Sequence, residues 1–198
     1  AKRLGVVNTL KFTDDGTIRG YNTDGYGILK ALSEEFGVSP EGKSIFVLGC
    51  GGAGRAVALT CAASGVTRLM LASRNADRAR IVGSEASNSF KDCNVEVIVS
   101  ELEAWRAACW EADIIVQCTL IGMDPGNNSL LPQDAFHAGQ YVYDLVYMHS
   151  ETTFMKVARE GGANVANGLG MLLHQGAKAF KIWTGQDADI IAMRDALE

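Results

Sequence analysis

Residues 44–64, which read SIFVLGCGGAGRAVALTCAAS, decide the fold of this chain. An apolar and partly β-branched run, residues 45–48, leads into a glycine-rich turn, and a segment of small residues follows it. Gly49, Gly51 and Gly54 stand at G-x-G-x-x-G spacing between the two segments. This spacing, with a strand before it and a helix after it, is the fingerprint of a dinucleotide-binding βαβ unit.

Each residue of this turn has a steric or electrostatic reason to bind a pyrophosphate. Gly49 allows the tight turn, Gly51 lets the backbone approach the ligand, and Gly54 lets the helix pack closely on the strand. Gly52 and Ala53 complete the loop. Because free amides and the helix dipole favour negative charge at a helix start, we predict that these five residues bind a dinucleotide cofactor.

The end of the next predicted strand, residues 67–72, indicates which cofactor binds. NAD-binding folds usually place Asp or Glu about 20 residues past the glycines, where it holds the ribose 2′-hydroxyl. This chain has Ser73, Arg74 and Asn75 there, with Arg78 one turn later. A guanidinium suits a 2′-phosphate, which an acid would repel. We therefore predict NADP rather than NAD; the alternative is two solvated arginines at a helix start.

Composition narrows the class of protein. The chain has 198 residues, is 47% hydrophobic and carries a net charge of −5, as expected of one soluble domain with additions. The charge and the lack of a Lys/Arg cluster argue against nucleic-acid binding. No apolar run approaches the roughly 20 residues of a membrane span. Five cysteines without C-x-x-C spacing and three scattered histidines favour reduced thiols in a cytosolic protein without a metal site.

Strands and helices alternate along the rest of the chain, as a parallel sheet requires. We predict strands at residues 95–99, 113–117, 141–145 and 164–166, helices at 77–90, 101–109, 152–159, 169–183 and 187–197, and a turn-rich loop at 122–129. The fold class is therefore α/β, with a Rossmann-like, doubly wound parallel sheet and C-terminal helices.

The first residues do not belong to this alternation. Two extended segments, 6–12 and 17–21, flank a Thr-Asp-Asp-Gly turn whose Asp-Gly pair predicts a hairpin. A helix is then expected to start with Thr23 or Asp24 as its N-cap. A hairpin before a complete Rossmann unit indicates the tail of another domain.

Seven stretches, taken in order, carry a family pattern: GVVNTL at 5–10, GYNTDGYG at 20–27, GCGGAGRA at 49–56, SRNADR at 73–78, CTLIGM at 118–123, YDLVY at 143–147 and NGLGMLLHQ at 167–175. Together they resemble the motifs of the shikimate dehydrogenase family. The resemblance implies an enzyme that reduces 3-dehydroshikimate to shikimate with NADPH, and that binds its substrate between an N-terminal α/β domain and the Rossmann domain.

The resemblance also implies roles for particular residues. Asp24 matches the family's catalytic aspartate, although a helix cap alone would also explain an Asp at this position. Asn8, Tyr147 and Gln175 match substrate-binding positions. Residues that match the cofactor positions near the nicotinamide are Thr119, Gly122, Met123, Gly168 and Met171. In this interpretation residues 1–24 are a hairpin remnant of the substrate domain, 25–166 the Rossmann domain with its linking helix, and 167–198 the helices that return toward the substrate domain.

Three departures from the family bear on activity. The family's catalytic lysine lies in an N-V-T-x-P-x-K segment that this sequence lacks, together with most of the N-terminal sheet. Met148-His149 also replaces the family's Asn-Pro after the tyrosine. We therefore expect a cytoplasmic NADP-dependent shikimate dehydrogenase that acts on a small-molecule substrate and is inactive without its N-terminal part. A homodimer is compatible with the sequence. The alternatives are a quinate/shikimate dehydrogenase and a non-catalytic NADP-binding regulatory module.

Overall fold

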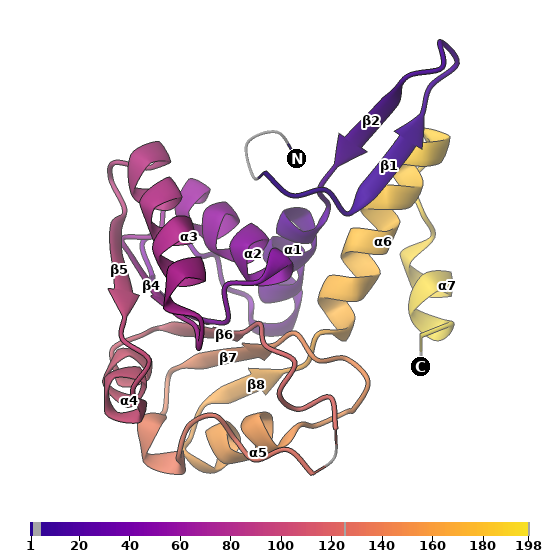
Figure 1. Ribbon diagram of the computed structural model, residues 1–198. Coiled ribbons are helices and arrows are strands. Elements are labelled where there is room, and N and C mark those ends of the chain that lie inside the picture. The colour runs from indigo at the N-terminus through magenta and orange to yellow at the C-terminus, as the bar shows by residue number, and fades with distance from the viewer. Residues whose placement is uncertain (2–4, 125, 198) are drawn as a thin grey trace.

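The computed structural model describes residues 1, 5–124 and 126–197 (Figure 1). Residues 2–4 and 198 of the expected domains and Pro125 of the expected turn lie outside the described residues. The centre is a six-stranded sheet in the order β5-β4-β3-β6-β7-β8, in which every neighbouring pair is parallel. Its strands are β3 (Ser44–Leu48), β4 (Arg68–Ala72), β5 (Asn94–Ile98), β6 (Ile114–Gln117), β7 (Tyr141–Asp144) and β8 (Asn164–Ala166). The predicted doubly wound sheet is confirmed.

Helices cover both faces of the sheet (Figure 1). One face carries α1 (Asp24–Phe36), α2 (Gly52–Ala63) and α3 (Ala76–Ser89), with α6 (Leu169–Thr184) packed on α1; the other carries α4 (Leu102–Trp110), the 3-10 turn η1 (Gln133–Ala135) and α5 (Thr153–Glu160). Along β3, Ile45 and Val47 enter the core of the first face, while Phe46 and Leu48 enter the second. Because side chains alternate along a strand, one apolar run fills two cores.

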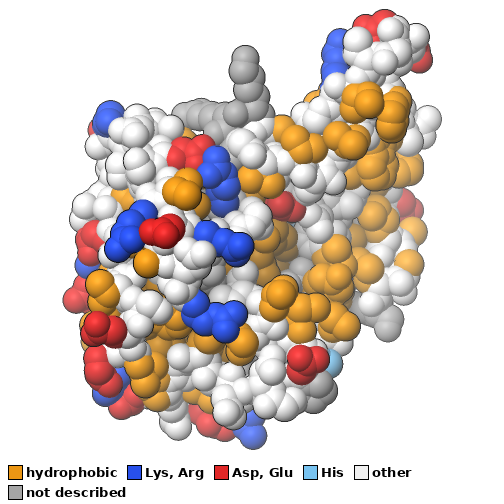
Figure 2. Space-filling model, viewed as in Figure 1, with side chains coloured by type: hydrophobic (Ala, Val, Ile, Leu, Met, Phe, Trp, Pro, Cys, Tyr) orange, Lys and Arg blue, Asp and Glu red, His pale blue; other side chains and the backbone are white. Residues whose placement is uncertain are grey.

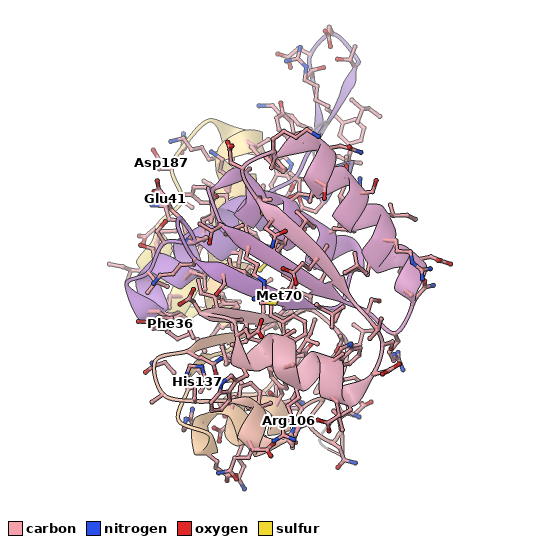
Figure 3. The ribbon with its side chains drawn as sticks, turned by 90° about the vertical axis from the view of Figure 1, so that its left-hand side faces the viewer. Phe36, Glu41, Met70, Arg106, His137 and Asp187 are labelled. Atoms are coloured by element: carbon pink, nitrogen blue, oxygen red, sulfur yellow. The ribbon has the colours of Figure 1, made fainter. Side chains whose placement is uncertain are left out.

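Figure 3, seen from the β5 edge, shows helices on either side of the sheet and places Met70 at the centre of the molecule. Met70 is fully buried in the core between the sheet and α4. The strand order reverses between β3 and β6, because β4 and β5 lie on one side of β3 and β7 and β8 on the other. Ligands of open α/β sheets bind outside the carboxyl ends of the strands at such a switch point.

A two-stranded antiparallel hairpin projects from this body (Figure 1), formed by β1 (Thr9–Phe12) and β2 (Ile18–Tyr21). It rests on the end of α6, where the Trp183 indole N–H donates to the Leu10 carbonyl at 2.7 Å and the Lys11 ammonium to the Ile182 carbonyl at 2.6 Å. Figure 2 shows apolar side chains along the hairpin and α6. Phe12 is 74% exposed and Trp183 55% exposed, so the described chain leaves this apolar face uncovered.

The last helix is shorter than the sequence predicts. It begins three residues later than expected, as α7 (Ile190–Asp195), because the Asp189 carboxylate caps it by accepting from the Ala192 amide at 3.0 Å. All five cysteines are free, and four are buried. Within the described ranges, no helix has the length and apolar character that a membrane span needs, and no His, Cys, Asp and Glu side chains gather as metal ligands.

Candidate cofactor and substrate site

The glycine loop leaves space where a ligand must approach. Gly49 has φ +99°, and a Cβ there would lie 2.9 Å from the Thr119 methyl. At Gly54 a Cβ would lie 1.8 Å from the Gly49 carbonyl oxygen, so only glycine lets α2 start this close to β3. At Gly51 and Gly52, by contrast, a Cβ would meet nothing within 4 Å. The loop therefore fits a pyrophosphate, which needs this free volume beside the amides of the helix start.

A groove of about 440 Å³ runs over this loop. Its lining comes from the glycine loop, the segment after β4 and the segment after β6: residues 48–53, Ser73, Arg74, Asn75, Arg78, Trp105, residues 118–121 and Leu130. The Asn75 side chain caps α3 by accepting from the Asp77 and Arg78 amides. The Asp77 carboxylate pairs with Arg80 at 2.8 Å. The Arg74 and Arg78 side chains are exposed, so the groove has a basic end suited to a phosphate.

A second cleft of about 260 Å³ adjoins the groove and shares Ala53, Cys118, Thr119 and Leu120 with it. Its other lining residues are Asp24, Met123, Leu145, Val146, Tyr147, Met148, Gly168, Met171, Leu172 and Gln175. The two spaces form one continuous site at the carboxyl ends of β3 and β6. Figure 2 shows the surface hollowed between the face of α2 and α3, with several Lys and Arg side chains, and α6.

Asp24 lies where three distant parts of the chain meet. Its carboxylate accepts from the side-chain amide of Asn8 at 2.7 Å and from that of Asn22 at 3.3 Å. The Asn8 side-chain nitrogen also donates to the side-chain oxygen of Gln175 at 3.4 Å. Asn8 precedes β1, Asp24 begins α1 and Gln175 lies on α6. The structure thus brings together three of the four residues expected to bind or turn over substrate.

The predicted N-cap of α1 is confirmed at Thr23, although the Thr23 side chain makes no capping hydrogen bond. Asp24 is the first helical residue. The Asn8 side-chain nitrogen donates to the Thr23 hydroxyl at 3.0 Å, and the Thr23 backbone N–H donates to the Asn8 side-chain oxygen at 2.9 Å. Because Asp24 caps nothing, its carboxylate is free to point into the cleft.

Tyr147, the fourth of these residues, lies on the loop after β7 and is 49% exposed at the cleft. Gly168 and Met171 lie at the start of α6. At Gly168 a Cβ would sit 2.2 Å from the Leu145 carbonyl oxygen, and the Met171 amide donates to the buried Tyr143 hydroxyl at 2.9 Å. These contacts hold the start of α6 against the loop that carries Tyr147.

Two cysteines line the site without offering a nucleophile. Burial raises the pKa of Cys50 to about 11, and burial raises that of Cys118 well above its ordinary value. Both thiols therefore stay protonated at neutral pH, and the thiolate is the reactive form.

Sequence reasoning missed several residues of the site. Trp105 and Leu130 line the cofactor groove from α4 and from the long loop after β6, and no motif marks them. Gln117 and Asp144 are completely buried beneath the cleft and hydrogen-bonded to each other at 3.2 Å. Polar residues at the carboxyl ends of two predicted strands were the available signal for this pair.

Burial raises the pKa of Asp144 to about 6, although hydrogen bonds from Thr152 and Val146 act to lower it. The folded chain therefore binds a proton more tightly than the unfolded chain. The stability from Asp144 is complete below about pH 4 and is lost as the pH rises through about 6, a change of at most about 3 kcal/mol. We expect Asp144→Asn to remove this pH dependence, measured as urea unfolding at pH 4.5 to 7.5.

Asp113→Asn serves as the control for this measurement. Burial acts to raise the pKa of Asp113, but hydrogen bonds from the Ser44 amide and hydroxyl hold this pKa below its ordinary value. Its contribution is lost only as the pH falls below that window. The measured quantity is the difference in free energy of unfolding between the wild type and the Asp144→Asn variant. If this difference does not change between pH 4.5 and 7.5, the pKa assigned to Asp144 is contradicted.

The fold and the site define a class: a Rossmann domain with a groove for a dinucleotide phosphate and an adjoining cleft for a small molecule. The family profile of the shikimate 5′-dehydrogenase C-terminal domain matches residues 168–198. A shikimate dehydrogenase (NADP(+)) of Moorella thermoacetica is 42% identical over 98% of this chain and 65% of its own length. The same enzyme of Methanothermobacter thermautotrophicus is 38% identical over 100% of this chain and 69% of its own.

Solved structures agree with these relatives. The shikimate 5-dehydrogenase of Listeria monocytogenes in complex with shikimate and NAD superposes with a TM-score of 0.91 at 33% identity, covering 100% of this chain and 70% of that one. The shikimate 5-dehydrogenase of Thermus thermophilus in complex with NADP(H) and shikimate gives 0.84 at 34%, covering 99% and 69%. The chain belongs to the shikimate dehydrogenase family and spans about two thirds of the length of these relatives. The predicted family is confirmed, and the relatives' names agree with the predicted function and cofactor.

Proposed function

We propose that this chain is the NADP-binding part of an oxidoreductase that interconverts 3-dehydroshikimate and shikimate in aromatic amino-acid biosynthesis. One observation carries the proposal: the groove with the open glycine loop and the exposed Arg74 and Arg78 runs directly into the cleft that holds Asp24. In the proposed assignment the two arginines bind the 2′-phosphate, the glycine loop binds the pyrophosphate, and Thr119, Gly122, Met123, Gly168 and Met171 surround the nicotinamide.

The chain's own residues would orient and protect the substrate. When bound, NADPH supplies the hydride for the substrate carbonyl. The Asp24 carboxylate, held by Asn8 and Asn22, is placed to accept a hydrogen bond from a substrate hydroxyl and to fix its orientation. Gln175 and Tyr147 add further polar groups to the lining of the cleft.

We assign the proton donor for the developing alkoxide to the lysine that the family resemblance implies for an N-terminal domain. Lysine beside a carboxylate in a semi-buried cleft can reach a suitable pKa for this role. The apolar face of the hairpin and α6, with Phe12 and Trp183 exposed, supports a covering domain there. We accordingly assign residues 1–24 to the substrate domain, 25–166 to the Rossmann domain and 167–198 to the returning helices.

The alternative function is a regulatory module that binds NADP without turnover. It gives no reason for the contacts that join Asn8, Asp24 and Gln175 in the cleft. The choice between shikimate and quinate depends largely on groups of the N-terminal part. A cytoplasmic location follows from the biosynthetic role, and a homodimer stays a prediction that sedimentation would test.

Replacing Arg74 with Ala tests the cofactor assignment. One charge-assisted hydrogen bond to the 2′-phosphate is worth about 1.5 to 3 kcal/mol, so NADPH should bind roughly 10- to 150-fold more weakly. NADH lacks this phosphate, and its affinity should stay within about twofold of the wild-type value. Titration of the chain with each cofactor measures the difference.

Arg80→Ala is the matched control, because Arg80 lies in the first turns of α3, shortly after Arg74, pairs with Asp77 and does not line the groove. It should leave both affinities unchanged. Equal weakening of NADPH and NADH by Arg74→Ala would show that Arg74 supports the fold of the groove and does not select the cofactor.

A further inference from the structure

The buried carboxylate of Asp144 is surrounded by hydrogen-bond donors from three segments of the chain. Asp144 is the last residue of β7 and is completely buried, and a buried carboxylate is unfavourable unless several donors surround it. Three donors do so: the Gln117 amide at 3.2 Å, the Val146 backbone N–H at 3.0 Å and the Thr152 hydroxyl at 2.6 Å. These donors belong to three separate segments: the end of β6, the loop after β7 and the start of α5.

The Gln117 side chain links Asp144 to the loop after β6. It is also completely buried, and its amide nitrogen donates to the Ile121 carbonyl at 2.7 Å as well as to Asp144. Its side-chain oxygen accepts from the Thr119 backbone N–H. One amide group thus holds both ends of the turn from Thr119 to Ile121.

The same loop packs against the start of α5. Gly122 has φ +105°, and a Cβ there would lie 3.4 Å from the Thr152 Cβ and 3.8 Å from a Val146 methyl. Thr152 also caps α5 by accepting from the Met155 amide at 3.2 Å. The three segments around Asp144 are therefore in contact with one another as well as with its carboxylate.

Two loops held by this network line the cleft. The loop after β6 contributes Thr119, Leu120 and Met123, and the loop after β7 contributes Val146 and Tyr147. Asp144 itself lines neither the groove nor the cleft, so it reaches no ligand. Its carboxylate connects the loop after β6, through Gln117, to the loop after β7, through the Val146 N–H.

We propose that Asp144 is a positioning residue that fixes the loop after β6 relative to the loop after β7, and thereby sets where the nicotinamide half of NADPH lies. This inference rests on the proposed function of the site. The adenosine half would lie at Ser73, Arg74 and Arg78, which line the groove but take no part in the hydrogen bonds that join Gln117, Asp144 and Thr152. The two halves of the cofactor should therefore respond differently when the network is broken.

The experiment compares two ligands on the chain as given. NADPH occupies both halves of the site, whereas adenosine 2′,5′-bisphosphate carries the 2′-phosphate but no nicotinamide. Asp144→Asn is expected to weaken NADPH at least about tenfold and to shift the fluorescence emission of bound NADPH. The affinity for adenosine 2′,5′-bisphosphate is expected to stay within about twofold, since that end of the groove is untouched.

Asp113→Asn is the matched control variant. Asp113 precedes β6 at its opposite end and accepts from the Ser44 amide and the Ser44 hydroxyl, each at 2.8 Å. It has the same residue type and a similar donor set but no contact with the cleft. Both affinities and the emission of bound NADPH should match the wild type.

If Asp144→Asn does not fold, Thr152→Val and Thr152→Ser decide the question. Valine removes the hydroxyl that donates to Asp144, and serine keeps it. Selective loss of NADPH affinity with valine and recovery with serine supports the proposal. Unchanged NADPH affinity and emission in Asp144→Asn or Thr152→Val, or equal weakening of both ligands, overturns it. Failure of the wild-type chain to bind either ligand would overturn the proposed function, and this inference with it.

Discussion

Asp24→Asn, placed in a fusion of this chain with the N-terminal domain of a shikimate dehydrogenase, should lower NADP-dependent shikimate oxidation by about 10²- to 10⁴-fold. The asparagine keeps the shape of the side chain and an oxygen that can accept from Asn8, whose amide lies 2.7 Å from the carboxylate. It removes the charge that orients a substrate hydroxyl beside the lysine. NADPH affinity should stay within about twofold, because Asp24 is assigned to a substrate hydroxyl and does not line the groove assigned to the 2′-phosphate and the pyrophosphate.

Steady-state rates and NADPH titration of the same fusion measure this effect. Asp134→Asn is the control: Asp134 pairs with Arg106 at 2.6 Å near α4, outside both spaces of the site. A variant that loses NADPH affinity together with its rate would assign Asp24 to the fold of the site. Robust shikimate oxidation by the 198-residue chain alone would contradict the proposed division of labour, since another of its residues would then move the proton.

Gly51→Val should abolish dinucleotide binding in a domain that folds normally. Gly51 has ordinary extended backbone at φ −76°, and a Cβ there meets nothing within 4 Å, so the chain itself tolerates a side chain. A valine would instead fill the volume assigned to the pyrophosphate. Losing two hydrogen bonds to a charged group is worth about 3 kcal/mol or more, so NADPH should bind at least about 100-fold more weakly.

Circular dichroism and NADPH titration separate binding from folding in this variant. Gly126→Val is a matched control, since a Cβ at Gly126 also meets open space but the residue lies outside the groove. It should bind NADPH like the wild type. If Gly51→Val keeps its NADPH affinity with a normal spectrum, the glycine loop is a structural turn only.

Local patterns were sufficient to predict the parallel sheet and the glycine loop. The positive φ of Gly49 and the close approach of Gly54 to the Gly49 carbonyl are features of one short turn, and alternation along β3 reflects the two faces of one strand. Contacts across the chain were not readable in this way. The Thr23 hydroxyl contacts Asn8 rather than capping α1, because the segment before β1 folds back over the helix start.

The buried polar groups beneath the cleft show the same limit. Gln117 and Asp144 end adjacent strands, but only the assembled sheet places their side chains 3.2 Å apart. On α6, the large apolar side chains of Phe180 and Trp183 are exposed, and the Trp183 indole N–H donates to the hairpin. Such contacts depend on which elements meet in space, and periodicity within one element carries no information about them.

The attachment of the hairpin to the end of α6 restricts how this family can be recombined. The same helix that receives the hairpin through Lys11 and Trp183 also carries Gln175 and Met171 into the cleft. A hairpin from one parent and an α6 from another would meet with mismatched side chains and displace the cleft wall. In chimeric enzymes, the first and last elements of this chain should be inherited together, while crossovers inside the sheet core are free of that linkage.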